Sequence, residues 1–386
     1  MPTAKTIASL FQEEPTRWGL RGDPHLWQDM RATLARHAYP STEKAEGAGQ
    51  MLSDELLTTL LTTHYAIEPQ AIAMIGPSNP DRLVYHVSGV DGQAWLLRIG
   101  LASAVLPAWI AAPSMERWMQ QQATLLDWCA HHAYPAPLVR STQQHTLIST
   151  HAGWHGLLLE FVAGTRPPAT PLAQYHIAAR LGLLHHTGRA AAQVDRAQLP
   201  QSWWSPLDSA IARAQQLFAA NMIIPAQWDL LIETCQTTLQ HCRSLSILPE
   251  TLIHGDCWLG NAIAHAPEEM YLIDWEYAGW GITLLDLGSL LSDCFAYPDA
   301  PAVIDTERIA AVMAGYQQHN QLSPEERDAL PLAIQFGSAF LTAIRCQLGS
   351  QTGWSAGISR GLRREQARLA ISAQIAAHAQ RSIPRA

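Results

Sequence analysis

The chain has 386 residues, of which 48% are hydrophobic and 15% are charged, and its formal net charge is −8. This composition excludes a disordered protein, and the acidic balance argues against a general nucleic-acid binder, whose surface would be basic. The length allows two or three core-forming units. The negative charge is compatible with a cationic small molecule as a substrate.

We identify no export signal and no membrane-spanning segment in the sequence. The first fifteen residues lack the apolar core of a signal peptide, and no stretch approaches eighteen apolar residues. The six cysteines form no C-x-x-C pair, which argues against a disulfide framework or a zinc ribbon. We therefore expect a cytoplasmic protein with no membrane partner.

Residues 1–70 are predicted to form a helical N-terminal extension of unknown role. Its first part contains Trp18 and Trp27, and a polar segment at 41–50 resembles a linker. Two interpretations stay open for the extension: anchoring onto the main body, or binding of a partner.

Residues 71–163 show the alternating pattern of a sheet. The runs 82–88 and 93–99 flank Asp91-Gly92, a dipeptide typical of a hairpin turn between strands. A second strand pair is predicted at 146–149 and 157–162, with a helix between the pairs at about 114–132. Residues 164–386 are mainly helical, with periodic segments at 172–187, 207–220, 228–245, 301–319, 323–349 and 359–378.

The candidate catalytic residues lie in the segment 254–286. His254-Gly-Asp256 is followed five residues later by Asn261, and Asp274 comes directly after the apolar run 270–273. The protein-kinase catalytic loop H-R-D-x-x-x-x-N has the same Asp-to-Asn spacing, and its later metal-binding Asp follows a strand. Mg²⁺ prefers oxygen ligands and is usually held by one or two protein groups together with phosphates. The pattern therefore indicates metal-assisted phosphoryl transfer.

HGDCWLGN followed by LIDWEYAGWG resembles the aminoglycoside phosphotransferase and choline kinase family, which has a protein-kinase-like fold. The resemblance implies an α+β, bilobal protein: a lobe with an antiparallel sheet and a helix at 71–163, and a larger helical lobe at 164–386. It implies that Asp256 is the catalytic Asp, that Asn261 and Asp274 bind Mg²⁺, and that Asp286 braces the catalytic loop. Where relatives have Gly-Asp-Pro before that last Asp, this chain has Gly281-Ile-Thr, and we expect a local rearrangement.

The same resemblance implies where ATP or GTP would bind. Ser78 and Asn79 lie where the family has its phosphate-covering loop, and Arg98 lies where it has a phosphate-binding cation. The backbone of Glu160 and Val162 would contact the purine. Such kinases also pair the cation with a helix carboxylate, and here either Glu116 or Gln122 occupies that place.

We therefore expect a small-molecule kinase that transfers the terminal phosphoryl group of ATP or GTP to a substrate hydroxyl. The doubtful helix carboxylate leaves an alternative, a catalytically weak nucleotide-binding regulator that uses residues 1–70 to bind a partner. The sequence does not identify the acceptor substrate. Trp258 and Trp280 could form an aromatic wall for a cation, and Asp293 and Asp299 could bind a polyamine.

Overall fold

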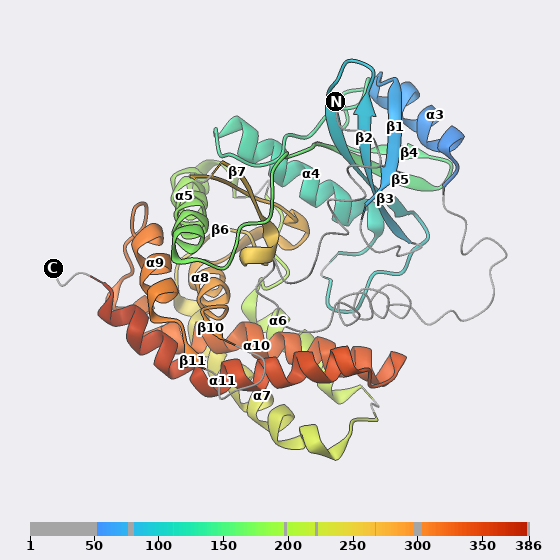
Figure 1. Ribbon diagram of the computed structural model, residues 1–386. Coiled ribbons are helices and arrows are strands. Elements are labelled where there is room, and N and C mark those ends of the chain that lie inside the picture. Colours follow the sequence, from blue (N-terminus) through green and yellow to red (C-terminus); the bar gives the residue numbers. More distant parts are fainter. Residues whose placement is uncertain are drawn as a thin grey trace.

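The computed structural model describes residues 52–75, 81–110, 112–196, 199–220, 223–266, 268–296 and 303–383. It confirms the α+β, bilobal kinase-like class, with a five-stranded antiparallel sheet in the N-terminal part and mostly helices in the C-terminal part (Figure 1). Ser78, Asn79, Asp299 and most of the predicted extension 1–70 lie outside the described residues. The division of the chain at residues 70 and 163 stays a prediction.

The N-terminal lobe, residues 52–160, is built on one sheet with strand order β1-β2-β3-β5-β4, in which all neighbours are antiparallel. Apolar residues of α3 pack against apolar residues of the sheet. Helix α4 lies between the sheet and the second lobe (Figure 1). The elements of this lobe are α3 (Asp54–Tyr65), β1 (Pro69–Met74), β2 (Arg82–Gly89), β3 (Ala94–Leu101), α4 (Met115–His131), β4 (Ser149–His151) and β5 (Trp154–Glu160).

Both predicted strand pairs exist. In the first, β2 and β3 pair from Arg82↔Gly100 to Ser88↔Ala94, and Gly92 takes a left-handed φ of 81° in the turn. The second pair is displaced along the chain relative to the prediction, because the turn falls at Ala152 and Gly153, both of which have positive φ.

Strand alternation determines which way Arg98 points. Its neighbours Leu97 and Ile99 are buried in the same cluster as Leu61 of α3. Because successive side chains of a strand point to opposite faces, Arg98 points away from α3, toward the second lobe.

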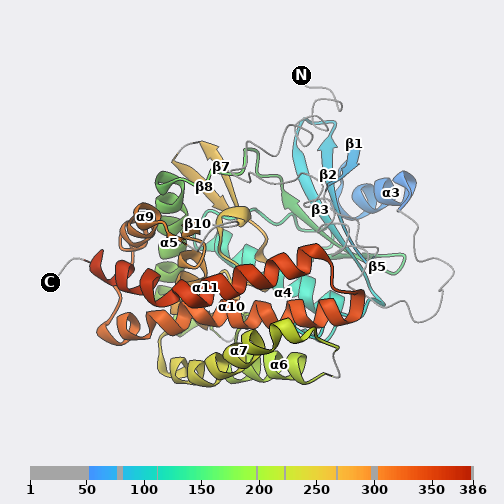
Figure 2. The ribbon, with the colours of Figure 1, turned by 60° about the horizontal axis from the view of Figure 1, so that its bottom comes forward.

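The described part of the C-terminal lobe contains three small strand pairs surrounded by helices. The pairs are β6 with β9, β7 with β8, and β10 with β11. The helices α10 and α11 lie side by side along one side of the lobe, with α6 and α7 next to them (Figure 2). The principal elements are α5 (Pro171–Asp195), α6 (Leu207–Ala219), α7 (Asp229–His241), β6 (Glu250–Ile253), β7 (Ala262–Ala266), β8 (Glu269–Leu272), β9 (Gly279–Ile282), α8 (Thr283–Leu291), β10 (Phe295–Ala296), β11 (Val303–Ile304), α9 (Thr306–Tyr316), α10 (Pro324–Thr352) and α11 (Ala356–Arg381).

Helix α10 corrects one expectation from the sequence. By length and composition it is apolar enough to cross a membrane, with a mean hydropathy of 1.3 in its most apolar window. However, 67% of that window is buried inside the protein, where α10 packs against α6, α7, α8 and α11. The apolar character of α10 therefore matches that of a helix in a protein core.

We expect Leu61→Ala to lower the free energy of unfolding by about 3 kcal/mol, because Leu61 is fully buried between α3 and the sheet. Urea denaturation would measure this. Leu230→Ala, on a side chain that is 71% exposed, is the matched control and should change little. Equal stabilities of the two variants would show that α3 is not part of the core of this lobe.

Candidate active site

The predicted catalytic loop, residues 254–261, begins where β6 ends and is held by Asp286 of α8. The backbone N–H of His254 donates to Asp286 Oδ2 at 2.6 Å, and that of Gly255 donates to Oδ1 at 3.0 Å. The Asp286 side chain is completely buried, so these donors compensate for the loss of its hydration. The bracing role implied by the resemblance thus corresponds to two short hydrogen bonds.

A histidine from α5 completes the surroundings of this carboxylate. His185 Nε2 lies 3.2 Å from Asp286 Oδ2, and His185 Nδ1 lies 2.9 Å from the hydroxyl of Tyr316 in α9. A neutral His185 with its proton on Nε2 satisfies both contacts, since it donates to Asp286 and accepts from Tyr316. The position of the catalytic loop therefore depends on α5, α8 and α9 together.

The glycine before Asp256 is required by close packing. Gly255 has a φ of 77°, and a Cβ at this position would lie 2.4 Å from the carbonyl oxygen of Tyr277. An L side chain would be strained in this conformation and would also collide with the neighbouring backbone. The conformation leaves room for Tyr277 and directs the chain into Asp256.

Asp256 and Asn261 lie together as the spacing predicts. Asn261 Nδ2 donates to Asp256 Oδ2 at 2.7 Å and to the Asp256 carbonyl at 3.0 Å. Burial raises the pKa of Asp256 to about 7, the negative charge of Asp274 contributes in the same direction, and the hydrogen bond from Asn261 opposes both. A carboxylate with a pKa in this range suits a general base that works near neutral pH.

Asp274 follows β8, and its side chain reaches Arg98 of β3. Its φ of 65° and ψ of 58° are left-handed, a conformation that Asp tolerates better than most residues. Its side chain is 41% exposed, and its Oδ1 is 3.1 Å from Arg98 Nη1. Asn261 uses its amide nitrogen to bind Asp256, which leaves its side-chain oxygen for another partner, and the N–H of Ile273, the residue before Asp274, donates to the backbone carbonyl of Asn261 at 2.9 Å. Two oxygens of this kind fit Mg²⁺, which completes its shell with phosphates and water.

Arg98 is bound by two carboxylates of the same loop. Besides Asp274, it contacts Glu276, with Nη2 and Oε2 2.6 Å apart, and Arg82 lies 3.9 Å from the same oxygen. Sequence reasoning missed Glu276, although an acid two residues after the predicted metal ligand was a visible signal. No lysine occurs after residue 44, so every long-chain cation of the described residues is an arginine.

The helix α4 does not supply the partner of Arg98. Glu116 is exposed in the first turn of α4, Gln122 is buried, and neither forms a hydrogen bond or ion pair with Arg98. Instead, Trp118 of α4 donates its indole N–H to the backbone oxygen of Glu276 at 2.9 Å. Of the two alternatives left open by the sequence, neither places a carboxylate of α4 on Arg98, and the loop after β8 provides the acids.

A loop before α6, residues 199–205, packs against both catalytic segments and was not predicted. Trp203 Nε1 donates to the Gly255 carbonyl at 2.7 Å, and its ring stacks on Tyr277 with centroids 4.2 Å apart. Trp280 in β9 exchanges backbone hydrogen bonds with Pro200 and Ser202. The Gly281-Ile-Thr segment thus forms the end of β9 and the start of α8, in place of the expected turn.

The predicted nucleotide contacts are only partly visible. Arg98 faces the catalytic loop, as described above, whereas Ser78 and Asn79 are outside the described residues. Glu160 is the last residue of β5, and its N–H donates to the carbonyl of Leu138 at 2.8 Å. The contact of Glu160 and Val162 with a purine stays a prediction.

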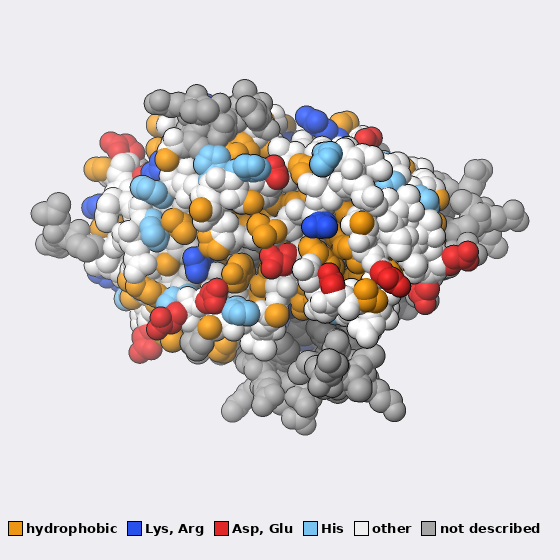
Figure 3. Space-filling view, turned by 90° about the horizontal axis from the view of Figure 1, so that it is seen from above, with side chains coloured by type: hydrophobic (Ala, Val, Ile, Leu, Met, Phe, Trp, Pro, Cys, Tyr) orange, Lys and Arg blue, Asp and Glu red, His pale blue; other side chains and the backbone are white. Residues whose placement is uncertain are grey.

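Two predictions about the acceptor side are wrong. Asp293 is buried and bound by Arg364 and Arg368, so its carboxylate is already neutralised and does not suit a polyamine. Trp280 is buried in β9, where it donates to Glu250, and it does not form an exposed wall. On the face shown in Figure 3, the described Arg side chains lie apart from one another and form no basic stripe.

We expect Asp286→Asn to lower the free energy of unfolding by about 3 kcal/mol, because an amide NH₂ would face a backbone N–H in a buried place. Amide hydrogen exchange of His254 and Gly255 should accelerate by the same change. Asp208→Asn, at an exposed ion pair with Arg243, is the control and should have almost no effect. Unchanged protection of both amides in Asp286→Asn would contradict the bracing role.

The chain is similar to known phosphotransferases in sequence and in fold. Residues 77–322 match the family model described as the phosphotransferase enzyme family. Homoserine kinase of Caulobacter sp. (strain K31) is 26% identical over 226 residues, which cover 57% of this chain and 67% of that protein.

Two solved structures share the fold. An amicoumacin kinase in complex with AMP-PNP and Ca²⁺ has a TM-score of 0.61 at 17% identity and covers 84% of this chain and 94% of its own. A microcompartment-associated aminopropanol kinase has a TM-score of 0.60 at 16% identity and covers 85% of this chain and 100% of its own. Because the family model spans more than half of the sequence, the chain belongs to the phosphotransferase enzyme family.

Proposed function

We propose that this protein is a Mg²⁺-dependent kinase that transfers the terminal phosphoryl group of ATP or GTP to a hydroxyl of a small molecule in the cytoplasm. The observation that carries the proposal is the juxtaposition of Asp256, Asn261 and Asp274 with Arg98 at the junction of the two lobes. The similar proteins are named as kinases of homoserine, aminopropanol and amicoumacin, which are all small molecules.

In the proposed reaction the acceptor oxygen bonds to the γ-phosphorus while the bond to the β–γ bridging oxygen breaks, and the nucleoside diphosphate leaves. Asp256 orients the acceptor hydroxyl and takes its proton. Arg98 provides positive charge for the phosphates from the sheet side. Asn261 and Asp274 would hold Mg²⁺, which supplies charge neutralisation of the phosphates when bound. Most of the catalytic effect would then come from positioning and electrostatics.

The regulator hypothesis loses its main motivation in this arrangement. It depended on a missing carboxylate partner for the nucleotide cation, and Glu276 provides that partner. The proposed partner-binding role of residues 1–70 stays untested by the described residues.

The acceptor requires a screen. Thermal shift with ATP, GTP and Mg²⁺ would first identify the donor, and a coupled phosphotransfer assay would follow over homoserine, amino alcohols, aminoglycosides, macrolides and sugars. Phosphorylation of none of these classes, with no Mg²⁺-dependent turnover of the nucleotide, would contradict the proposal.

We expect Asp256→Asn to lower kcat about 10³-fold while the dissociation constant for the nucleotide changes little, because the substitution removes a base and keeps the shape. Steady-state kinetics and isothermal titration calorimetry would measure the two quantities. Full activity of this variant would show that another group accepts the proton.

We expect Glu276→Gln to raise the KM for the nucleotide about fivefold and to lower kcat about tenfold, because Arg98 loses its shortest ion pair and moves away from its position. Glu116→Gln is the matched control in exposed α4 sequence and should behave as the wild type. The opposite ranking of the two variants would restore the helix carboxylate as the partner of Arg98.

A further inference from the structure

The peptide group between Gly255 and Asp256 is held at both ends. Its carbonyl oxygen accepts a hydrogen bond of 2.7 Å from the indole N–H of Trp203, and its N–H donates to Nδ1 of His254 over 3.4 Å. Because a peptide group is rigid and planar, these two contacts set the direction in which the chain enters Asp256. The shorter contact comes from outside the predicted catalytic loop, from the segment before α6.

Gly255 makes a restraint on this peptide group important. The residue has no Cβ, so its backbone changes conformation more easily than that of other residues. Asp286 binds the N–H of Gly255, but that N–H belongs to the preceding peptide group. Among the described residues, the only hydrogen bond to the Gly255 carbonyl comes from Trp203. Without this bond, the group could rotate and turn the side chain of Asp256 away from Asn261.

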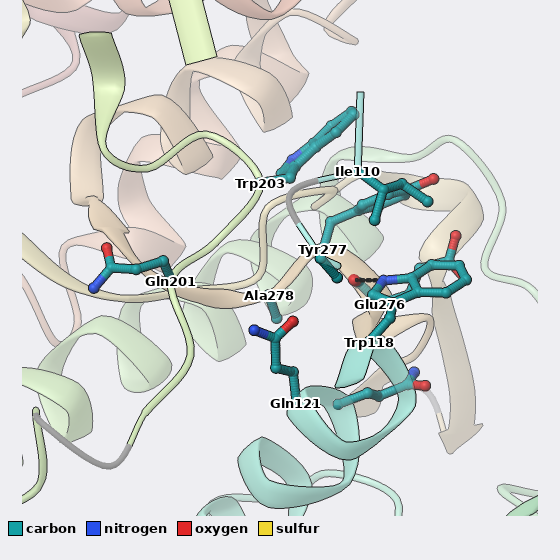
Figure 4. A pocket seen from close by; sticks show the side chains of 10 residues that line it. Ile110, Trp118, Gln121, Gln201, Trp203, Glu276, Tyr277 and Ala278 are labelled. Atoms are coloured by element: carbon teal, nitrogen blue, oxygen red, sulfur yellow. Dashed lines mark hydrogen bonds between the residues drawn. The ribbon is translucent and has the colours of Figure 1, made fainter. Parts of the chain in front are cut away.

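Trp203 also contacts the loop that follows β8, in which Asp274 lies. Its ring stacks on Tyr277 with centroids 4.2 Å apart, and its backbone N–H donates to the Tyr277 carbonyl at 3.3 Å. Figure 4 shows the two side chains next to each other. A single residue therefore touches the segments that carry the proposed base and a proposed metal ligand. Phosphoryl transfer depends on the relative placement of these two groups.

The backbone around Trp203 is fixed independently of its side chain. Trp280 in β9 donates its N–H to the carbonyl of Pro200 at 2.7 Å, and the N–H of Ser202 donates to the carbonyl of Trp280 at 3.0 Å. Arg213 of α6 donates to the carbonyl of Trp203. These contacts use main-chain atoms of the segment, so a conservative change of the side chain at position 203 leaves them in place.

The neighbouring Trp204 provides an internal comparison. Both residues are buried, with 6% of Trp203 and 3% of Trp204 exposed, and their rings stack with centroids 5.4 Å apart. The ring of Trp204 also meets Phe336 of α10 edge-on at 5.6 Å. However, the indole nitrogen of Trp204 is buried without a hydrogen-bond partner among the described residues. The two residues thus resemble each other in size and burial and differ in the hydrogen bond to the predicted catalytic loop.

We propose that Trp203 is a positioning residue for phosphoryl transfer: its indole N–H holds the peptide group before Asp256, and its ring keeps that group next to the loop after β8. Trp203 acts through Asp256 and contributes no group to the reaction itself. The effect on the rate rests on the proposed kinase function, whereas the restraint on the peptide group does not. Loss of the indole N–H would therefore slow the chemical step more than it weakens binding of the substrates.

The structural test measures amide hydrogen exchange of Asp256 by NMR in the full chain. Trp203→Phe keeps an aromatic ring against Tyr277 but removes the N–H donor, and we expect the Asp256 amide to exchange about tenfold faster. Trp204→Phe removes an indole N–H that has no described partner and should leave this exchange rate unchanged. An unchanged rate in Trp203→Phe, or the same acceleration in both variants, would overturn the restraint.

The kinetic test uses the best acceptor from the screen. We expect Trp203→Phe to lower kcat about tenfold, while the KM for the nucleotide and the KM for the acceptor change less than about twofold. Trp204→Phe should stay within about twofold of the wild type in all three quantities. A general loss of packing would instead lower the activity of both variants. Equal kcat in the two variants, or a raised KM with unchanged kcat in Trp203→Phe, would overturn the positioning role.

The two tests separate this proposal from the proposed function. If no acceptor is phosphorylated, the kinase function fails, and the exchange comparison still decides whether Trp203 holds the peptide group. If the exchange rates differ as expected but kcat does not change in Trp203→Phe, the restraint exists without a role in the reaction, and the positioning role is overturned.

Discussion

The buried carboxylate of Asp286 is the constraint on which the site depends. It has no access to water, so it needs donors, and it obtains them from the first two peptide groups of the catalytic loop and from His185. This requirement fixes the loop relative to α5 and α8, and Tyr316 extends the contact to α9. The loop that carries Asp256 is therefore positioned by the core of the C-terminal lobe and needs no substrate to hold its beginning in place.

A second set of contacts joins the two lobes. Arg98 extends from β3 of the first lobe to Asp274 and Glu276 of the second, and Trp118 of α4 contacts the backbone of the same loop. The two carboxylates keep Arg98 in place where phosphates would otherwise be its partners. A nucleotide bound as proposed would have to share this arginine with the loop after β8, so its binding would be coupled to the position of that loop.

The sequence predicted the features that depend on local patterns. Three such features are the Asp91-Gly92 hairpin, the helix α4 and the spacing of Asp256 and Asn261. Each depends on residues that are close together in the sequence. The partner of Arg98 was not predictable in this way, because Glu276 lies 178 residues further along the chain and is selected by the fold. The contact of Trp203 with the catalytic loop has the same origin, because the two lie about fifty residues apart in the sequence and are brought together by the fold.

The most direct measurement of the central claim is anomalous diffraction from crystals grown with a non-hydrolysable ATP analogue and Mn²⁺ in place of Mg²⁺. The account predicts a metal peak coordinated by Asn261 and Asp274, with phosphate oxygens in the same coordination shell and the Asp256 carboxylate left for the acceptor. A metal held by Asp256 in place of Asp274, or a nucleotide bound away from Arg98, would contradict it.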